Sequence, residues 1–199
     1  MARTKEQTDQ MSAATREKIE AAGLACFAQK GFALTSMKDI AEAAGISTGL
    51  IYRHFASKQE LFARLVDDTM TEMTETIRFL DAESSPSRAL VQVTDGLLRD
   101  IQANERISQY FILMTRSLLA LEPLPQMEEL QKIDLLLFRQ AARLIERGQE
   151  QGEFKPGDSY QLSLFYFSII QGIADMKLFM GDRYIVPSAE DVMVFLYNK

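Results

Sequence analysis

The stretch SMKDIAEAAGISTGLIYRHF, residues 36–55, predicts two short helices joined by a tight turn. Ser36 is followed three residues later by Asp39, a capping-box pattern that satisfies backbone N–H groups at a helix start. Gly45 can adopt the left-handed backbone conformation that ends a helix, and Ser47 can cap the helix that follows. This spacing is typical of a helix-turn-helix, in which the second helix enters the major groove of DNA.

The second of these helices is predicted to have a buried face and an outer face. Ile51 and Phe55 are four residues apart, so both can point into a core. Thr48, Tyr52 and Arg53 then lie on the outer face. The pattern indicates a helix that is anchored on one side and free to contact DNA on the other.

Helical spacing continues through the rest of the chain, and no alternating apolar and polar run is bounded by hairpin turn residues. We expect nine helices, over residues 13–30, 36–44, 47–55, 57–80, 87–103, 105–121, 126–151, 159–180 and 189–197. The polar residues 1–11 are expected to form a frayed arm. The prediction is an all-α fold, with a three-helix DNA-binding head over residues 1–56 and a helical-bundle body over residues 57–199.

Charge is divided unevenly between these two parts of the 199-residue chain. Residues 1–58 carry 8 Lys/Arg and 6 Asp/Glu, whereas residues 59–199 carry 14 and 22, so the net charges are +2 and −8. A mildly basic head on an acidic body is compatible with DNA binding, because only the surface near the phosphates must attract them.

The few reactive side chains exclude several classes of protein. The single cysteine, Cys26, excludes an internal disulfide and suits a reducing compartment, and the single histidine leaves too few ligands for a His/Cys zinc site. No nucleophile, base and orienting carboxylate form a recognisable catalytic set. No apolar run reaches the roughly 18–20 residues that cross a bilayer. We therefore expect a cytoplasmic protein that is not an enzyme and that holds no cofactor or metal.

Residues 15–62 closely resemble the DNA-binding domain of the tetracycline-repressor (TetR) family. The resemblance lies in TREKI (15–19), FAQKGF (27–32), TSMKDIA (35–41), AGIS (44–47), Gly49, YRHF (52–55), SK (57–58) and ELF (60–62). It covers about a quarter of the chain, and the remainder agrees only in length and helical character. It implies a homodimer that binds a palindromic operator, and a C-terminal domain that binds a small-molecule inducer and releases the DNA.

The resemblance also implies DNA contacts by position. They fall on Tyr52, His54 and Lys58 at phosphates, on Thr35, Ser36 and Lys38 at the start of the second helix, and on Thr48, Leu50 and Arg53 at bases, with Ser47 and Gly49 beside them. Arg53 is the best candidate for a hydrogen-bonded base contact, whereas Leu50 can contact only a thymine methyl group. Taken singly, Tyr52 could instead be a core aromatic and His54 a surface histidine.

The segment 159–180 is apolar on two faces, and a helix of this kind must be buried on both. One face can pack on its own domain and the other on a second subunit. Residues 189–197 would then complete a four-helix dimer interface, as in the resembled family. The alternative is a deeply buried central helix in a monomer.

Aromatic and polar side chains of the body are candidates for a ligand pocket between helices. They are Phe79, Tyr110, Phe111, Met114, Arg116, Phe138, Phe165, Gln171 and Asp175. Each apolar member could equally be plain core. The composition indicates an apolar or aromatic inducer with one polar or charged end. A ligand-independent regulator, or an activator with the same head, is the alternative that the sequence leaves open.

Overall fold

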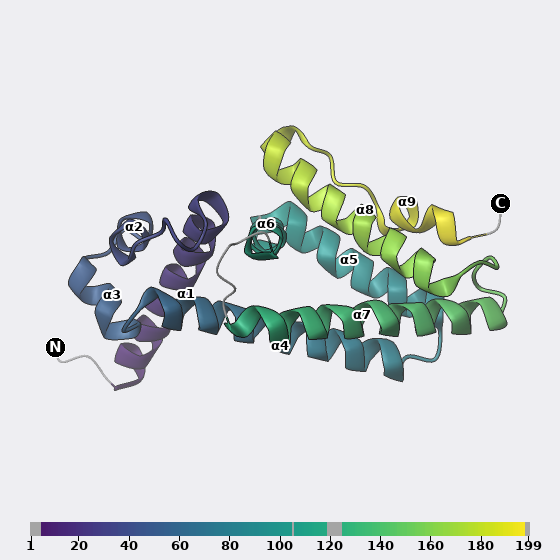
Figure 1. Ribbon diagram of the computed structural model, residues 1–199, viewed down its shortest axis with the longest axis horizontal. Helices are drawn as coiled ribbons and strands as arrows, with labels where there is room; N and C mark the ends of the chain where they lie inside the picture. The colour runs from purple at the N-terminus through teal and green to yellow at the C-terminus, as the bar shows by residue number, and fades with distance from the viewer. Residues whose placement is uncertain (1–4, 105, 119–124, 198–199) are drawn as a thin grey trace.

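The computed structural model describes residues 5–104, 106–118 and 125–197, and every regular element in these ranges is helical. The elements are α1 (Lys5–Lys30), α2 (Met37–Ala43), α3 (Thr48–His54), α4 (Lys58–Ala82), α5 (Pro86–Asn104), α6 (Arg106–Leu118), α7 (Pro125–Glu150), α8 (Ser159–Met180), α9 (Ala189–Met193) and the 3₁₀ turns η1 (Gly181–Arg183) and η2 (Val194–Leu196). Figure 1 shows α1, α2 and α3 gathered at one end, with the remaining helices bundled at the other. The predicted all-α architecture is confirmed.

Helix starts follow the capping residues of the sequence. Ser36 and Asp39 form the predicted capping box at the start of α2. At α4, Ser57 Oγ accepts a hydrogen bond from the backbone N–H of Glu60 at 3.1 Å. The Glu60 carboxylate accepts from the N–H of Ala56 at 2.7 Å rather than from that of Ser57, so α4 has one half of a capping box.

Helix α1 is longer than the sequence indicated. It begins at Lys5 rather than near residue 13, so the prediction of a frayed arm is wrong for residues 5–11. The side chains described before Thr15 are exposed. Lys, Glu and Gln favour helices by propensity, and this part of α1 has no apolar stripe that could have revealed it.

The head core joins α1–α3 to the body helices. Phe27 of α1, Ile51 of α3 and Phe62 of α4 are almost completely buried, and the rings of Phe27 and Phe62 meet edge-on with centroids 5.6 Å apart. Leu113 of α6 and Leu130 of α7 belong to the same core. Fully burying one such side chain contributes about 1.5–3 kcal/mol. The head therefore packs on α6 as well as on α4.

The body core lies between α4, α5, α7, α8 and α9. Leu144 and Ile170 belong to it and have no exposed surface. The buried hydroxyls of Tyr166 and Thr94 are hydrogen-bonded to each other at 2.8 Å, so α8 is joined to α5 by a satisfied polar contact. Figure 1 shows α4 and α7 running side by side along the length of the body.

Helix α8 is buried on one side and apolar on both. Tyr166 and Ile170 face the core, whereas Phe165, Met176 and Phe179 are 52%, 43% and 83% exposed. With η1, this helix is long and apolar enough to cross a membrane, contrary to the expectation that no segment would qualify. One such helix is weak support for a membrane span, because a core helix passes the same test.

The end of α7 depends on the absence of a side chain at Gly148. A Cβ atom there would lie 2.1 Å from Cδ2 of the buried Phe154 ring. Gly148→Ala should lower the free energy of unfolding by about 1–3 kcal/mol, the usual cost of overpacking. Gly96→Ala in α5 is the control, since its Cβ would meet nothing within 4 Å, and it should raise stability by about 0.5–1 kcal/mol. Equal stability of the two variants in urea denaturation would contradict this packing.

Candidate DNA-binding surface and ligand cavity

Helix α3 presents one face to solvent, as its sequence predicts. Ile51 and Phe55 have no exposed surface and hold the helix in the head core. Thr48 and Arg53 are exposed, and Tyr52 is 53% exposed. These three side chains therefore extend from a rigidly anchored helix and are accessible to a DNA groove.

Short backbone contacts fix the angle between α2 and α3. Gly45 has a φ of 66°, a region that favours glycine, and the N–H of Ile46 donates to Ala41 O at 3.0 Å. The exposed Ser47 then caps α3. Gly49 is also exposed, and a Cβ atom there would meet nothing within 4 Å, so packing inside the head does not require a glycine.

A salt bridge ties α2 to the end of α1. Lys30 Nζ lies 2.6 Å from Asp39 Oδ1, while Asp39 Oδ2 accepts from the N–H of Ser36 at 2.9 Å. The hydrogen bonds from Lys30 and then Ser36 hold the pKa of Asp39 well below its usual range. Ser36 and Lys38 are exposed beside this bridge, and the half-buried Leu50 and His54 lie on α3.

Two predicted DNA contacts, Lys58 and Thr35, make hydrogen bonds within the head. Lys58 Nζ donates to the carbonyl oxygens of Phe32, Ala33 and Thr35 at 2.8, 3.2 and 2.9 Å, which uses all three ammonium protons. The Thr35 side chain is 2% exposed, and its hydroxyl donates to Gly31 O at 2.8 Å. Both side chains therefore hold the turn between α1 and α2, and their contact with DNA stays a prediction.

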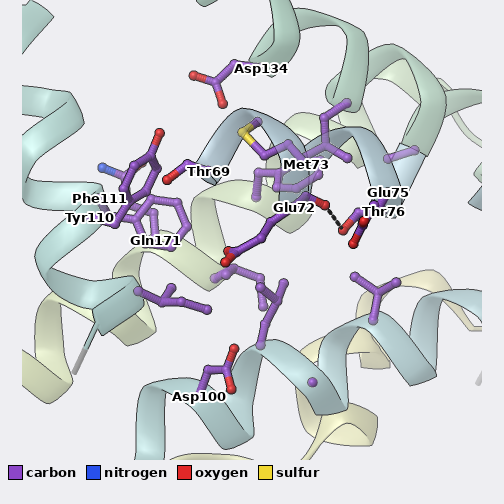
Figure 2. Close-up of a pocket in the computed structure, with 18 of the residues that line it drawn as sticks. Thr69, Glu72, Met73, Glu75, Thr76, Asp100, Tyr110, Phe111, Asp134 and Gln171 are labelled. Atoms are coloured by element: carbon purple, nitrogen blue, oxygen red, sulfur yellow. Dashed lines mark hydrogen bonds between the residues drawn. The ribbon is translucent and has the colours of Figure 1, made fainter. Parts of the chain in front are cut away.

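A cavity of about 830 Å³ lies between the helices of the body. This volume is within the roughly 300–1,000 Å³ typical of small-molecule sites. Its apolar wall includes Phe79, Leu90, Phe111, Leu137, Phe138, Phe167 and Ile170. Its polar wall consists of Thr69, Glu72, Glu75, Thr76, Gln92, Asp100, Tyr110, Asp134, Tyr166 and Gln171, most of which are labelled in Figure 2.

The cavity includes part of the predicted pocket. Of the candidates, Phe79, Tyr110, Phe111, Phe138 and Gln171 line it. Phe165 and Asp175 do not, because they lie on the exposed side of α8, where the ring of Phe165 packs on that of Phe195 with centroids 4.8 Å apart. The side chains of Met114 and Arg116 lie outside the described part of the structure.

Sequence reasoning missed the acidic side chains of the cavity. Glu72 and Glu75 of α4 and Asp100 of α5 are exposed, whereas Asp134 of α7 is half-buried. In the sequence each resembles a solvated position on an amphipathic helix, and only the packing of three helices brings them to one space. Desolvation raises the pKa of Asp134 to about 6.

Tyr110 lies beside Asp134 in the cavity wall. Burial, followed by the charge of Asp134, raises the pKa of Tyr110, while the nearby hydroxyl of Thr69 acts in the opposite direction. The Thr69 hydroxyl itself donates to Leu65 O at 3.0 Å. Within the described residues, the buried Tyr110 hydroxyl makes no hydrogen bond of good geometry. A buried polar atom of this kind is rare in folded proteins.

Known proteins share both the sequence and the fold. The family model for "Bacterial regulatory proteins, tetR family" matches residues 19–65. The uncharacterized HTH-type transcriptional regulator YfiR of Bacillus subtilis (strain 168) is 32% identical over 188 residues, covering 90% of this chain and 86% of YfiR. The chain belongs to the TetR family of transcriptional regulators.

Two solved structures of similar regulators contain small molecules. A putative transcriptional regulator from Saccharomonospora viridis, in complex with choline, has a TM-score of 0.63 and 20% identity, covering 90% of this chain and 92% of that one. The SmeT–triclosan complex has a TM-score of 0.64 and 25% identity, covering 92% of this chain and 88% of that one. The TetR-family fold thus extends over the body as well as the DNA-binding head.

In this TetR-family regulator the cavity lies directly against the head. Leu24 of α1 and Leu65 of α4 belong to the head core and also line the cavity. On α6, Tyr110 packs against the head core and the next residue, Phe111, packs against the body core. A molecule in the cavity would therefore touch side chains that also position α1.

We expect Asp134→Asn to stabilise the protein. Its pKa of about 6, against 3.8 ordinarily, means that the folded state binds the proton more tightly than the unfolded chain. Asp134 thus favours folding below pH 4, and this stabilisation is lost as pH rises through 6. Removing the charge should add about 1–2 kcal/mol at pH 7.5, after allowance for partial solvent exposure.

Urea denaturation at several pH values measures this effect. The gain of Asp134→Asn should shrink between pH 7.5 and pH 5, as the native carboxylate takes up its proton. Glu146→Gln, which alters an exposed carboxylate on the same helix outside the cavity, is the control and should change stability little. A loss of stability, or a gain independent of pH, would contradict the burial of Asp134.

Proposed function

We propose that the protein is a homodimeric repressor that acts in the cytoplasm, binds a palindromic operator through α3, and is released by a small molecule held in the body cavity. The observation that carries the proposal is the shared packing of cavity and head at Leu24, Leu65 and Tyr110. The choline and triclosan complexes of similar regulators support a small molecule as the ligand.

The DNA contacts are proposed for the exposed side chains of the head. Arg53 and Thr48 extend from the outer face of α3, where they can reach base edges. Tyr52 and the half-buried His54 are suited to phosphates, with Ser36, Lys38, Ser47, Gly49 and Leu50 around them. The head over residues 1–56 and the body over residues 57–199 then divide DNA binding from ligand binding and dimerisation, although the first turns of α4 pack in the head core.

The exposed face of α8 is the proposed dimer interface, with residues 189–197 beside it. Phe165, Met176 and Phe179 share this face with the exposed, small Ser168 and Gly172, which allow a second helix to approach closely. The 67% exposed Val194 of η2 extends the apolar surface. Two subunits joined here can place two α3 helices about 34–36 Å apart, the spacing of successive major grooves on one side of DNA.

Release follows from a difference in ligand affinity between two arrangements of the heads. A ligand that binds better when the heads are displaced shifts the population away from the DNA-bound arrangement. Helices α4 and α6 can transmit the displacement, because each contributes side chains to both the cavity wall and the head core. Coupling of about 1–3 kcal/mol would be typical, and DNA must weaken ligand binding by the same factor.

Selection from random DNA tests operator recognition. We expect enrichment of a palindrome, and Arg53→Ala should relax the preference at one base position at a cost of about 1–3 kcal/mol. Tyr52→Ala should weaken binding almost uniformly across sequences, as the loss of a phosphate contact does. Failure to enrich any sequence would refute specific recognition.

Sedimentation tests the dimer. Phe179→Glu should give monomers with little operator affinity, because a charge on this face opposes burial and two half-sites must be bound together. Ile185→Glu is the matched control, since Ile185 is 89% exposed but lies after η1, off the α8 face. A monomeric mass for the unaltered protein at micromolar concentration would count against the interface.

A further inference from the structure

We infer that the cavity selects a hydrophobic organic cation, that is, a largely apolar molecule that carries a positive charge. This inference rests on the proposed function. The sequence indicated only an apolar ligand with some polar or charged end. The arrangement of charge and aromatic rings in the cavity determines the sign of that charge.

The described lining of the cavity carries negative charge only. Glu72, Glu75, Asp100 and Asp134 contribute four carboxylates, and no Lys, Arg or His is among the described lining residues. A negatively charged ligand would be repelled by these carboxylates. A positively charged ligand is attracted by them, and the attraction is stronger in a partly dry cavity than in water.

The carboxylates are spread around the space rather than gathered at one point. Figure 2 shows Asp134 and Asp100 on opposite sides of the cavity, with Glu72 between them. Among the described residues, no group of three or more His, Cys, Asp or Glu could hold a metal ion. The distribution therefore suits an extended organic cation better than a small inorganic one.

Aromatic rings complete the site. Tyr110, Phe111, Phe138 and Phe79 line the same cavity, and the faces of such rings attract organic cations. The Tyr110 hydroxyl is buried and makes no hydrogen bond of good geometry within the described residues, where the Thr69 hydroxyl is its polar neighbour, so a ligand can offer it a better-placed partner. This buried hydroxyl is an observation separate from the acidic side chains.

Asp134 is the carboxylate with most to gain from a cation. It is half-buried, and within the described residues desolvation is the cause that shifts its pKa, with no basic side chain to offset it. A desolvated carboxylate is costly unless it is paired. A bound organic cation would supply the missing partner, which makes Asp134 the main determinant of charge selectivity.

Three probes test the charge directly: tetraphenylphosphonium and tetraphenylborate, which have nearly equal size and shape, and the smaller, neutral triphenylphosphine oxide. Calorimetry with the 199-residue protein should give the tightest binding for the phosphonium. Its dissociation constant should be at least about tenfold lower than that of the borate, a difference of about 1.4 kcal/mol in binding free energy. Equal or tighter binding of the borate or of the neutral oxide would overturn the proposal. So would a failure of the phosphonium to bind.

Substitutions locate the selectivity. Asp134→Asn should weaken phosphonium binding about tenfold, as expected for a partly buried charge, and Glu72→Gln about two- to threefold, as expected for an exposed one. Neither substitution should weaken binding of the neutral oxide, whereas a folding defect would weaken binding of all three probes. Glu146→Gln on the same helix as Asp134 is the control and should bind all three probes like the unaltered protein. Phosphonium affinity unchanged by both cavity substitutions would overturn the role of the carboxylates.

The same samples separate this inference from the proposed function. Operator affinity without probe, measured by fluorescence anisotropy on a selected DNA, tests the DNA-binding function alone. Tight phosphonium binding that leaves operator affinity unchanged would support the cation site and refute release by ligand. Operator release by the neutral oxide and not by the phosphonium would support release by a ligand and overturn the preference for a cation.

Discussion

The contact between α6 and α1 determines how the two parts of this regulator relate to each other. Because Leu113 of α6 is buried in the head core, the head cannot move on α4 without also moving against α6. Tyr110, one turn earlier on the same helix, faces both that core and the cavity. Cavity and head therefore share one continuous packed region, and a packed region tends to switch between discrete arrangements rather than deform gradually.

The carboxylate proposed to select the ligand also lowers the stability of the folded protein. Asp134 is held half-buried without a basic partner in the described structure, at a cost to folding at neutral pH. Such a cost is common where a site must remain ready for a ligand. A cation that pairs with Asp134 removes the cost only in the arrangement that accommodates it, which is the difference in affinity that a switch requires.

Local chemistry in the sequence was enough to predict the helix-turn-helix, because Ser36, Gly45 and Ser47 act within a few residues of their own positions. The orientation of α8 could not be predicted, since a helix that is apolar all round gives no periodic signal of which face turns outward. Phe167 lines the cavity and Ile170 is buried, although either could have faced a partner. Likewise, no local pattern in the sequence indicates that Lys58 Nζ donates to three carbonyl oxygens of the head.

The distance between the two heads of a dimer tests most directly whether the cavity controls DNA binding. A spin label can be attached at the exposed position 42 of α2 through Glu42→Cys, and pulsed electron resonance then measures the distance between the two labels of a dimer. The native Cys26 reacts little with the label, because it is buried and burial raises its pKa. With operator bound, we predict one narrow distance distribution. Saturating tetraphenylphosphonium should replace it with a different distribution, and Asp134→Asn should need more of the probe to produce the same change. If calorimetry shows that the probe has filled the cavity and the distance distribution is nevertheless unchanged, control of DNA binding by the cavity is contradicted.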